Sequence, residues 1–502
     1  MNEREFEEFI RRNPDLAMRL IVKAFNEKEL LTIGNRSYID AFKYPESYFD
    51  PKDLVQSSGM LQPLRDPSKL FTDYVVAPAS YIIFQDDAGR IYAKNGKTGQ
   101  IEFFGTDASK VIQNAINALA GRGKIFIKIG SYNLSSPIQV SISSGSITIE
   151  GEGPDTYLSR NFGGSDFMIK VMGSTGRGMF ILKNLTLWAV YNNLLNPVID
   201  IESTEPDKRW IIDNIRIFYG LPALRLAGYV WCGYFNIPYI YTPNSTTSWT
   251  GTNAVILLEQ STYKDIPKIN HFKQLNIRSY SNSAYPFDYA LNIYGGYNVF
   301  DEIEVDLGYW NKGIIYISGW SNRIKHFRAQ DVSKTANTIS AVILDGTKCV
   351  GNWIEGFIPA CNKHVVFSNG AYRNYVRMQA FGSSPQIDAT GAGSDNMVEF
   401  VTPNLASTTA FTLTHTGNPV IYRGYRVENS DVATFSGDGT TTQFKIAHGL
   451  ASTPKSAVVT PASGDAKGTF YVTVDATYIY VNYATAPPAG TNNVVLYWYA
   501  KV

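Results

Sequence analysis

Five segments of the chain align without gaps, and each begins with asparagine. They start at Asn270, Asn298, Asn322, Asn352 and Asn374. Weaker copies start at Phe180, Trp210 and Cys232, and the steps between successive starts run from 22 residues (Asn352 to Asn374) to 38 residues (Cys232 to Asn270). The third, sixth and eighth positions are apolar in most copies; in the copy at Cys232 they hold Tyr234, Ile237 and Tyr239. Such a repeat predicts a solenoid, because stacked copies build a continuous inner wall.

The segment before the repeat predicts a helix followed by short strands. Residues 106–120 begin with capping residues and place Val111, Ile112, Ala115 and Ile116 at helical spacing. Alternating strands follow at residues 124–129, 130–134, 138–142 and 147–153. This order, with its Gly-X-Tyr strand and its Ile-X-Ile-X-Gly-X-Gly strand, resembles the entrance of pectate-lyase-like right-handed parallel β-helices. The resemblance implies a parallel β-helix over residues 105–385, with the helix at 106–120 as its cap.

The remaining sequence predicts four further parts, so the expected fold class is mainly β with a β-helix at its centre. Residues 1–34 predict an N-terminal helical attachment segment, in which Asn13 can cap and Pro14 can occupy the first helical position. Residues 35–104 contain short hairpin strands with Asp/Asn-Gly turns, which predict a small β adaptor. Residues 386–430 predict a β linker or neck, and residues 431–502 predict a C-terminal β-sandwich module.

Charge and composition exclude several classes of partner. The chain has 45 Lys and Arg against 44 Asp and Glu, a net charge of +1. Because neither sign accumulates, we expect no nucleic acid partner and no anionic membrane surface, and no apolar stretch is long enough for membrane insertion. Three cysteines and five histidines show no disulfide framework and no metal-ligand spacing, so we predict no metal and no cofactor. The acidic start lacks the basic region of a signal peptide, which predicts folding in the cytoplasm where the chain is made.

One short segment carries a cluster of four carboxylates. They are Asp301, Glu302, Glu304 and Asp306. Glu304 and Asp306 fall on outward positions of their expected strand, two residues apart. Paired carboxylates on the outer face of a β-helix are what a polysaccharide hydrolase or lyase would use for acid and base catalysis. These four residues are therefore the candidate catalytic group if the chain is an enzyme.

The repeat also supplies a structural interpretation of the same carboxylates. The fourth position of successive copies holds Lys183, Asp213, Phe235, Lys273, Asp301, Lys325, Glu355 and Arg377. Opposite charges are adjacent in most steps, as expected for ion pairs stacked between coils. Arg328 follows Glu304 at the seventh position, and Arg278 precedes Asp306 at the ninth. A carboxylate flanked by arginines stays ionised and is a poor general acid, so this interpretation favours a scaffold over an enzyme.

Motifs of known enzymes point the same way. Polygalacturonase-like enzymes carry four motifs in order, and the repeat region contains only the last of them, as Arg323-Ile324-Lys325. The Asn-Thr-Asp and Gly-His-Gly motifs are absent from the sequence. Enzymatic activity is therefore an alternative rather than the main expectation.

The last module is rich in tyrosine at positions expected to face outward. Alternation places Ile479, Val481 and Tyr483 on one face of a strand, and Val494, Leu496 and Trp498 on one face of another. The opposite faces then carry Tyr478, Tyr480, Tyr497 and Tyr499, with Tyr471 nearby. Exposed tyrosines can stack on sugar rings and donate hydrogen bonds, and they are equally favoured at protein interfaces. The five tyrosines are therefore candidates for ligand binding or for subunit contact.

The order of parts resembles that of viral tail spikes and fibres. An N-terminal segment is followed by a β-helix and then by a terminal module that looks like those on such fibres, including fibres of archaeal viruses. The resemblance implies a homotrimer on the virion surface, attached to a virion protein through its N-terminal segment, that binds a host-surface glycan or glycoprotein receptor. A β-helix polysaccharide lyase or glycoside hydrolase is the alternative. A cellular adhesin is a third possibility, which the missing export signal disfavours.

Overall fold

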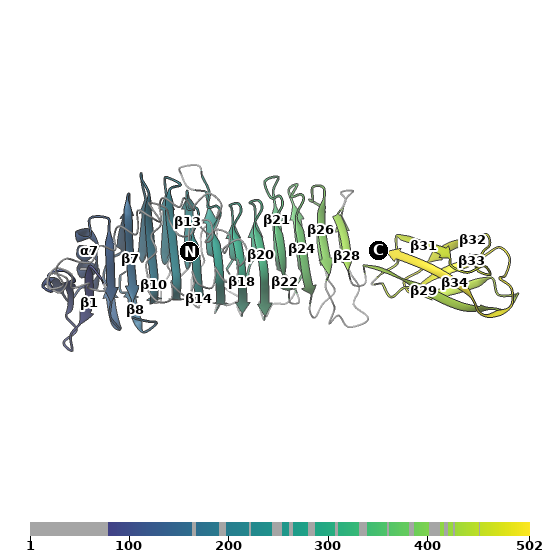
Figure 1. Ribbon diagram of the computed structural model, residues 1–502, viewed down its shortest axis with the longest axis horizontal. Coiled ribbons are helices and arrows are strands. Elements are labelled where there is room, and N and C mark those ends of the chain that lie inside the picture. The colour runs from purple at the N-terminus through teal and green to yellow at the C-terminus, as the bar shows by residue number, and fades with distance from the viewer. Residues whose placement is uncertain are drawn as a thin grey trace, which may run out of the picture. The chain divides into compact units, whose positions relative to one another are not determined.

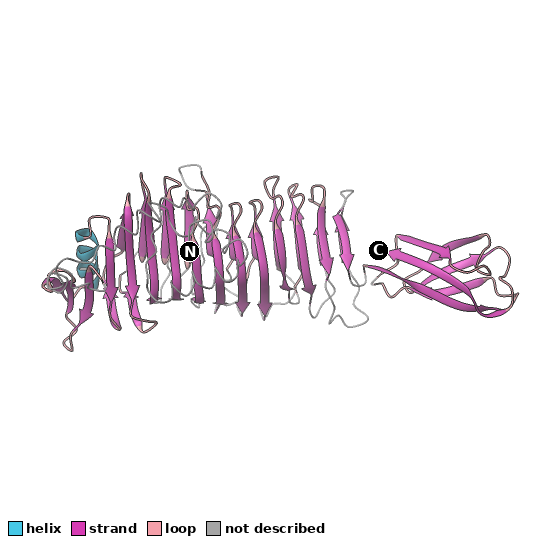
Figure 2. Cartoon of the chain, viewed as in Figure 1, coloured by secondary structure: helices cyan, strands magenta, loops and turns pink. Residues whose placement is uncertain are grey.

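The computed structural model describes residues 79–162, 167–189, 197–219, 222–242, 254–260, 265–279, 287–306, 310–330, 339–358, 361–380, 386–400, 412–415, 420–424, 427–450 and 452–502. Within these residues the chain is mainly β and contains one α-helix (Figures 1 and 2). The expected helical segment at residues 1–34, and residues 35–78 of the expected adaptor, lie outside the described residues.

Two long parallel sheets form a parallel β-helix, because successive strands of the chain alternate between them. The first sheet contains β4 (Gly123–Ile127), β7 (Gly145–Gly151), β10 (Gly178–Trp188), β12 (Lys208–Phe218), β14 (Tyr234–Thr242), β16 (His271–Ser279), β18 (Val299–Asp306), β20 (Arg323–Gln330), β22 (Trp353–Ile358), β24 (Tyr375–Ala380), β26 (Asn396–Phe400) and β28 (Val420–Gly424). The second contains β6 (Ile138–Ile142), β9 (Ile169–Gly173), β11 (Ile199–Ser203), β13 (Leu224–Gly228), β15 (Ala254–Glu259), β17 (Tyr289–Ile293), β19 (Gly313–Ile317), β21 (Ser340–Asp345), β23 (Lys363–Ser368), β25 (Gln386–Ala389) and β27 (Thr412–His415). Every neighbouring pair in these two series is parallel, as the repeat predicts.

The first coils have a third face, which long bent strands provide. β5 (Gly130–Leu134) pairs with β8 (Thr156–Arg160), and β8 pairs with the second half of β10, whose first half pairs with β7. Between these halves Asn184 has a φ of 58°, and Asn214 has a φ of 52° at the matching point of β12. Asparagine adopts this left-handed conformation more readily than most residues, and Asn214 Nδ2 also donates to Asn184 Oδ1 at 3.0 Å.

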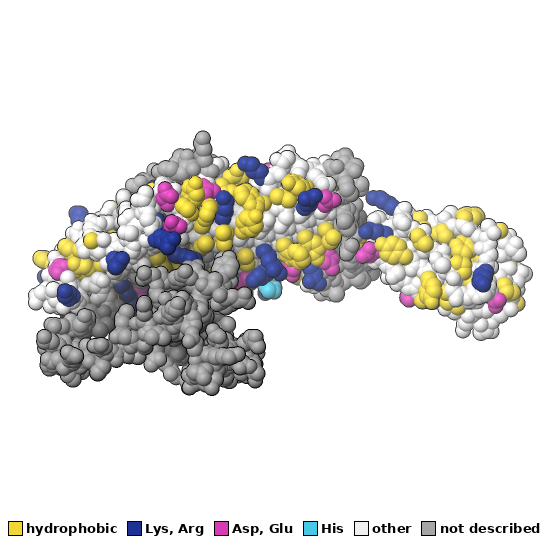
Figure 3. Space-filling model, turned by 45° about the horizontal axis from the view of Figure 1, so that its top comes forward, with side chains coloured by type: hydrophobic (Ala, Val, Ile, Leu, Met, Phe, Trp, Pro, Cys, Tyr) yellow, Lys and Arg dark blue, Asp and Glu magenta, His cyan; other side chains and the backbone are white. Residues whose placement is uncertain are grey.

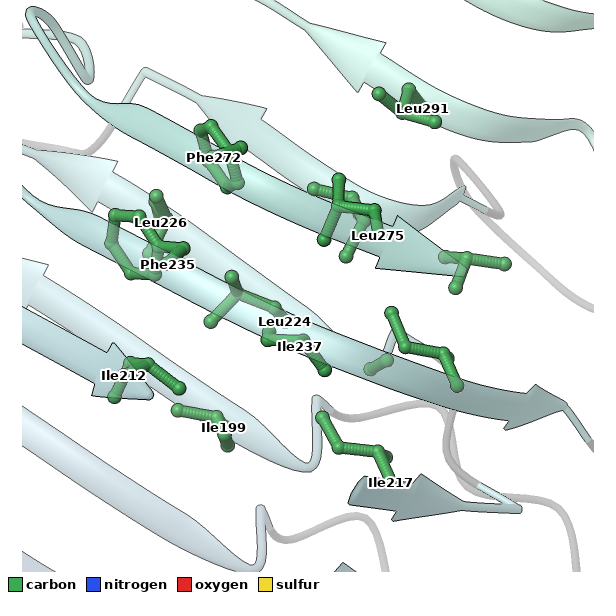
Figure 4. Close-up of a cluster of buried hydrophobic side chains, with 14 of the residues drawn as sticks. Ile199, Ile212, Ile217, Leu224, Leu226, Phe235, Ile237, Phe272, Leu275 and Leu291 are labelled. Atoms are coloured by element: carbon green, nitrogen blue, oxygen red, sulfur yellow. The ribbon is translucent and has the colours of Figure 1, made fainter. Parts of the chain in front are cut away.

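The apolar positions of the repeat line the interior. Phe235, Phe272 and Phe300 stack on successive coils, with ring centroids 4.8 and 4.4 Å apart. Figure 4 shows Phe235 and Phe272 among the buried side chains that fill this interior. Stacked rings of this kind combine burial of apolar surface with favourable aromatic geometry. The inner wall predicted from the repeat is therefore present.

One copy of the repeat has a different register from the predicted one. Phe235 and Ile240 are fully buried, whereas Tyr234 and Tyr239 are only partly buried. Register shifts between β14 and β16 place Phe235 opposite Phe272, one residue later than the ungapped alignment assumes. Phe235 is therefore not part of the fourth-position charge series.

The first position of the repeat forms a buried ladder of asparagines. Its members are Asn270, Asn298, Asn322, Asn352, Asn374 and Asn396. From Asn270 to Asn374, each Nδ2 donates to the Oδ1 of the next member at 2.9–3.1 Å. Each Oδ1 from Asn298 onward also accepts the backbone N–H of the preceding member. A buried amide needs such partners, which explains why this position is asparagine. Asn396 is a copy that the five-segment alignment misses.

The strand pairing extends the two sheets beyond the expected limits of the β-helix. At its start, β1 (Tyr81–Gln85), β2 (Ile91–Asn95) and β3 (Ile101–Gly105) form an antiparallel meander, and β1 pairs in parallel with β4. Helix α7 (Ala108–Ala118) follows, with Asp107 accepting the N–H of Ser109 at 3.0 Å as its N-cap. At the other end, β25 to β28 continue both sheets to Gly424. Part of the segment assigned to a linker, 386–430, is thus paired with the β-helix.

The last module consists of two three-stranded antiparallel sheets. One has β29 (Glu428–Gly437), β34 (Gly490–Lys501) and β31 (Ser456–Pro461), with β34 in the centre. The other has β30 (Gln443–Ala447), β33 (Tyr478–Tyr483) and β32 (Phe470–Val474), with β33 in the centre. A single apolar cluster joins them, including Ile479, Val481, Leu496 and Trp498. The two sheets therefore pack face to face as a β-sandwich.

Candidate functional site

The four carboxylates predicted as a cluster lie together on β18. They are Asp301, Glu302, Glu304 and Asp306. Phe300, Ile303 and Val305 of the same strand are buried in the interior. Asp301 and Glu302 lie between the inward side chains of Phe300 and Ile303. Glu304 and Asp306 lie on either side of inward Val305. All four carboxylates are therefore on the outer face of the first sheet.

Asp301 is held between two nitrogen donors on the neighbouring coils. Lys325 Nζ on β20 lies 2.6 Å from one carboxylate oxygen, and His271 Nε2 on β16 lies 2.6 Å from the other. Partial burial by itself raises the pKa of Asp301, but the hydrogen bonds from Lys325 and His271 outweigh it and hold this pKa below its usual value. Asp301 is therefore ionised at neutral pH and has no proton to donate as a general acid.

Glu304 and Asp306 have the neighbours that the repeat predicts. Asn276 Nδ2 donates to Glu304 at 3.0 Å, and Arg328 Nη1 lies 3.9 Å from the same carboxylate. Arg278 Nε lies 3.7 Å from Asp306. These contacts join the carboxylates to β16 and β20, so they stabilise the stacking of coils. Glu302 is the most exposed of the four.

A groove of about 750 Å³ opens on this outer face, from Lys273 and Gln274 on β16 across β18, β20 and β22 to β24. Asp301, Glu302 and Glu304 line it, and Asp306 does not. The groove coincides with a change of register. Ile324 pairs with Ile354, and Phe327 pairs with Gly356, so two residues of β20 (Lys325 and His326) lie opposite one residue of β22. The outer surface is uneven at this step because the two strands differ by one residue.

The register change also moves an apolar side chain that the repeat assigns to the interior. Phe357 occupies a sixth position, but it lies opposite Arg328 rather than opposite Phe327, which pairs with Gly356. Phe357 therefore lines the groove, together with Arg328. The groove combines an aromatic ring with groups of both charges, which suits a ligand with both apolar and hydrogen-bonding surfaces.

Ion pairs between coils are not confined to this cluster. Glu150 on β7 lies 2.7 Å from Lys124 and 3.3 Å from Lys183, one on each neighbouring strand. On the second sheet, Asp200 lies 2.7 Å from Arg225 and is 5% exposed. Figure 3 shows basic and acidic side chains beside one another on the β-helix surface. The carboxylates of β18 therefore follow a pattern that the scaffold uses elsewhere for stacking.

The five predicted tyrosines are exposed to different degrees, and they do not form one patch. Tyr471, Tyr478 and Tyr480 lie on the outer face of the β30–β33–β32 sheet, whereas Tyr497 and Tyr499 lie on the outer face of the β29–β34–β31 sheet. The most exposed are Tyr471 at 66% and Tyr497 at 57%. The sandwich core separates the two groups, so a single ligand of small size cannot contact both.

The two outer faces differ in chemistry. Tyr480 donates to Asp475 at 2.6 Å, and Lys445 Nζ lies 5.5 Å from the centre of its ring. On the other sheet, Val432 pairs with Tyr497 and Val458 pairs with Tyr499, and both valines are exposed. The first face is thus polar around its tyrosines. The second exposes Val432, Val458 and Tyr497, an apolar strip interrupted by the polar strand partners Ser430 and Thr460.

Sequence reasoning missed a cluster of aromatic side chains on the β-helix. Trp188 on β10, Phe218 on β12 and Tyr241 on β14 are in register and only partly buried. They occupy the ninth position of the repeat once the register of β14 is corrected, and Arg278 and Asp306 continue the same row. Comparing the ninth position of the copies would have revealed this row.

No group of three or more His, Cys, Asp or Glu side chains among the described residues is placed to hold a metal ion. Across the same part of the chain, no helix has the length and apolar character needed to cross a membrane.

Neither a protein-family model nor a curated protein matches the chain. Among solved structures, it is similar to the tailspike gp61 of Pseudomonas phage phi297, at 11% identity and a TM-score of 0.36, over 78% of this chain and 92% of that one. ORF18 of Geobacillus virus E2 has the same identity and TM-score, over 84% and 90%. The Gp54 tailspike of Acinetobacter baumannii bacteriophage AP22, solved in complex with a capsular saccharide, is 10% identical with a TM-score of 0.30, over 79% and 93%.

These three structures come from viruses of bacteria, so they give no support to the archaeal part of the expected resemblance. At such low identities and TM-scores, the strand pairing of the chain itself defines the fold.

Proposed function

We propose that the chain is a virion spike or tail-fibre protein that attaches to a glycan or receptor on the host surface and does not cleave it. The observation that carries the proposal is the pairing of Asp301 with Lys325 and His271. It engages one of the candidate catalytic carboxylates in contacts between coils, while tyrosines on the sandwich remain exposed. A surface of this kind favours binding over acid catalysis.

The same proposal assigns roles to the parts of the chain. The N-terminal segment at residues 1–34 attaches the protein to another virion protein, and the protein acts at the virion surface as a homotrimer. The exposed side chains of Val432, Val458 and Tyr497 support subunit contact, because aromatic and apolar side chains concentrate at the core of subunit interfaces. Tyr471, Tyr478 and Tyr480 on the opposite, more polar face support contact with a glycan.

A β-helix polysaccharide lyase or glycoside hydrolase remains a second candidate, because one observation favours it. Glu302 and Glu304 line the groove, and their carboxylates are accessible there. Two carboxylates in a groove are the minimum that acid and base chemistry on a glycosidic bond requires.

One experiment separates the two functions. The full-length protein is added to a panel of immobilised bacterial surface polysaccharides, and binding is measured together with the release of reducing ends or unsaturated products. We expect binding to at least one polysaccharide without product. Absence of binding across the panel would overturn the proposal.

Matched variants of the carboxylates complete the experiment. The alternative is that the wild-type protein releases product, and that Glu302→Gln and Glu304→Gln lose this release with unchanged thermal midpoints. That result would establish the enzyme instead. Asp388→Asn is the control, because this carboxylate lies outside the groove on the second sheet, where it pairs with Lys363 at 2.5 Å.

A further inference from the structure

The aromatic cluster on the first sheet is separate from both the groove and the sandwich. At its centre, the rings of Trp188 and Phe218 stack at 5.0 Å between centroids, and those of Phe218 and Tyr241 stack at 5.4 Å. Their planes are inclined by only 21° and 12°. The three side chains follow one another on neighbouring strands and lie on the outer side, because buried Leu187, Ile217 and Ile240 precede them.

Further rings flank this column at steep angles. Tyr219 stands at 69° to Trp188, with centroids 5.2 Å apart, and Tyr239 stands at 49° to Phe218. Tyr157 meets Trp188 edge-on at 6.4 Å. Stacking covers both faces of Phe218, so the cluster presents ring edges together with the flanking tyrosine rings, which add hydroxyl groups. An apolar surface next to hydroxyls matches a sugar ring, which has C–H groups on its faces and hydroxyls around its rim.

Two guanidinium groups lie beside these rings. Arg216 is in register with Thr186 and with Tyr239, and its side chain is exposed. Within the described part of the chain, no carboxylate forms an ion pair with Arg216. Thr186 itself donates to the carbonyl of Pro154 at 2.5 Å, so it is already engaged within the scaffold. A charged group is thus available beside the aromatic surface.

Arg278 extends the row from Tyr241 toward Asp306. A hydrogen bond with Tyr241 raises the pKa of Arg278, so this side chain stays charged. Its Nε is 3.7 Å from the Asp306 carboxylate and has no hydrogen-bond partner among the described residues. The Nε itself is buried, but the side chain as a whole is 40% exposed, so a ligand can approach the guanidinium from its exposed side.

From this juxtaposition we propose that the outer row Trp188–Phe218–Tyr241, with Arg216 and Arg278, binds an acidic polysaccharide. Sugar rings pack on the aromatic cluster, and carboxylate groups of the polysaccharide pair with the two guanidinium groups. Arginine suits this role because its planar fork can bind a carboxylate through two hydrogen bonds. The inference rests on the proposed attachment function and names the ligand class and a second binding surface for it.

The test uses the full-length protein and the same panel of polysaccharides, divided into uronate-containing and neutral members. We expect binding to an acidic member, weakened about tenfold by Arg216→Gln and by Trp188→Ala, as the loss of one strong contact implies. We also expect the affinity to fall as salt rises. Arg122→Gln and Trp353→Ala are the matched controls, because both side chains are exposed elsewhere on the described surface.

The outcomes separate this inference from the attachment function. If the wild-type protein binds a polysaccharide and Arg216→Gln and Trp188→Ala bind it equally well, the row is not the site, although attachment stands. If only neutral polysaccharides bind, the assignment to an acidic ligand is wrong. If none binds, the attachment function itself fails.

The oligomer mass distinguishes ligand binding at the row from subunit contact, and Arg216→Gln distinguishes ligand binding from altered packing. If light scattering shows a lower oligomer mass for Trp188→Ala than for the wild type, the row contacts a second copy of the chain. This result would overturn the inference. Because Trp188→Ala can also disturb packing, Arg216→Gln provides the independent reading, since an exposed side chain is not needed for folding.

Discussion

Asp301 and Lys325, on neighbouring coils of the β-helix, are joined by a contact of 2.6 Å between a carboxylate oxygen and the ammonium nitrogen. Both side chains remain partly exposed, at 31% and 38%, so solvent screens their attraction. The contact makes Asp301 part of the stacking between coils. It also gives a direct way to distinguish a structural carboxylate from a catalytic one.

We expect Lys325→Gln to lower the free energy of unfolding by about 0.2–1 kcal/mol, the range for exposed ion pairs. Chemical denaturation of the variant and of the wild type measures the change. Lys110→Gln is the control, because Lys110 pairs with Asp107 at 3.6 Å and is 80% exposed. An unchanged midpoint for Lys325→Gln would contradict the structural role of the pair.

The asparagine ladder predicts a larger effect from a single amide. Asn322 accepts the backbone N–H of Asn298 at 3.1 Å and donates to the carbonyl of Gly295 at 3.0 Å. Asn322→Ala leaves these buried groups without partners, which costs about 1–3 kcal/mol for each unsatisfied group. The thermal midpoint should fall clearly. Asn114→Ala, on the exposed side of α7, should leave it nearly unchanged; equal effects of the two substitutions would show that the ladder contributes nothing.

Buried His364 predicts a dependence of stability on pH. Burial lowers the pKa of His364 to about 4, against about 6.5 in an unfolded chain. The unfolded state therefore binds a proton between these values while the folded state does not, so stability falls as the pH drops from about 6.5 to about 4. We expect the thermal midpoint of His364→Gln to depend less on pH over this range than that of the wild type. His326 is exposed, so the thermal midpoint of His326→Gln should depend on pH as in the wild type. A slope that persists in His364→Gln would assign it to other groups.

The sequence was sufficient to predict the β-helix because its information is periodic. The coils from Asn270 onward repeat an asparagine, and most copies repeat the same inward apolar positions. Each of these side chains packs against the matching side chain of the neighbouring coil. The register of β14 was missed because an ungapped alignment cannot represent the shift that places Phe235 opposite Phe272. The change between β20 and β22, which coincides with the groove, has the same origin: the residue opposite Phe327 is Gly356, one position earlier in its copy.

The candidate site was harder to predict than the fold. The neighbours of Glu304 and Asp306 follow from the repeat and were predicted correctly. The distribution of the tyrosines was not, because alternation within a strand says which side chains face outward but not which strands share a sheet. Tyr480 and Tyr497 are separated because β33 and β34 are central strands of different sheets. That pairing depends on contacts between strands far apart in the chain.

The separation of the tyrosines predicts that two substitutions of similar chemistry have different consequences. On the β29–β34–β31 sheet, Tyr497→Ser with Val458→Ser removes the centre of the apolar strip, where the two side chains are 57% and 56% exposed. We expect this variant to dissociate at protein concentrations that keep the wild type oligomeric, because burial of apolar surface drives subunit association. Light scattering over a dilution series measures the change. Tyr471→Ser with Tyr478→Ser on the opposite sheet should keep the wild-type mass and instead bind polysaccharide less tightly. If both double variants change mass alike, or neither changes mass, the two faces do not have the separate roles assigned to them.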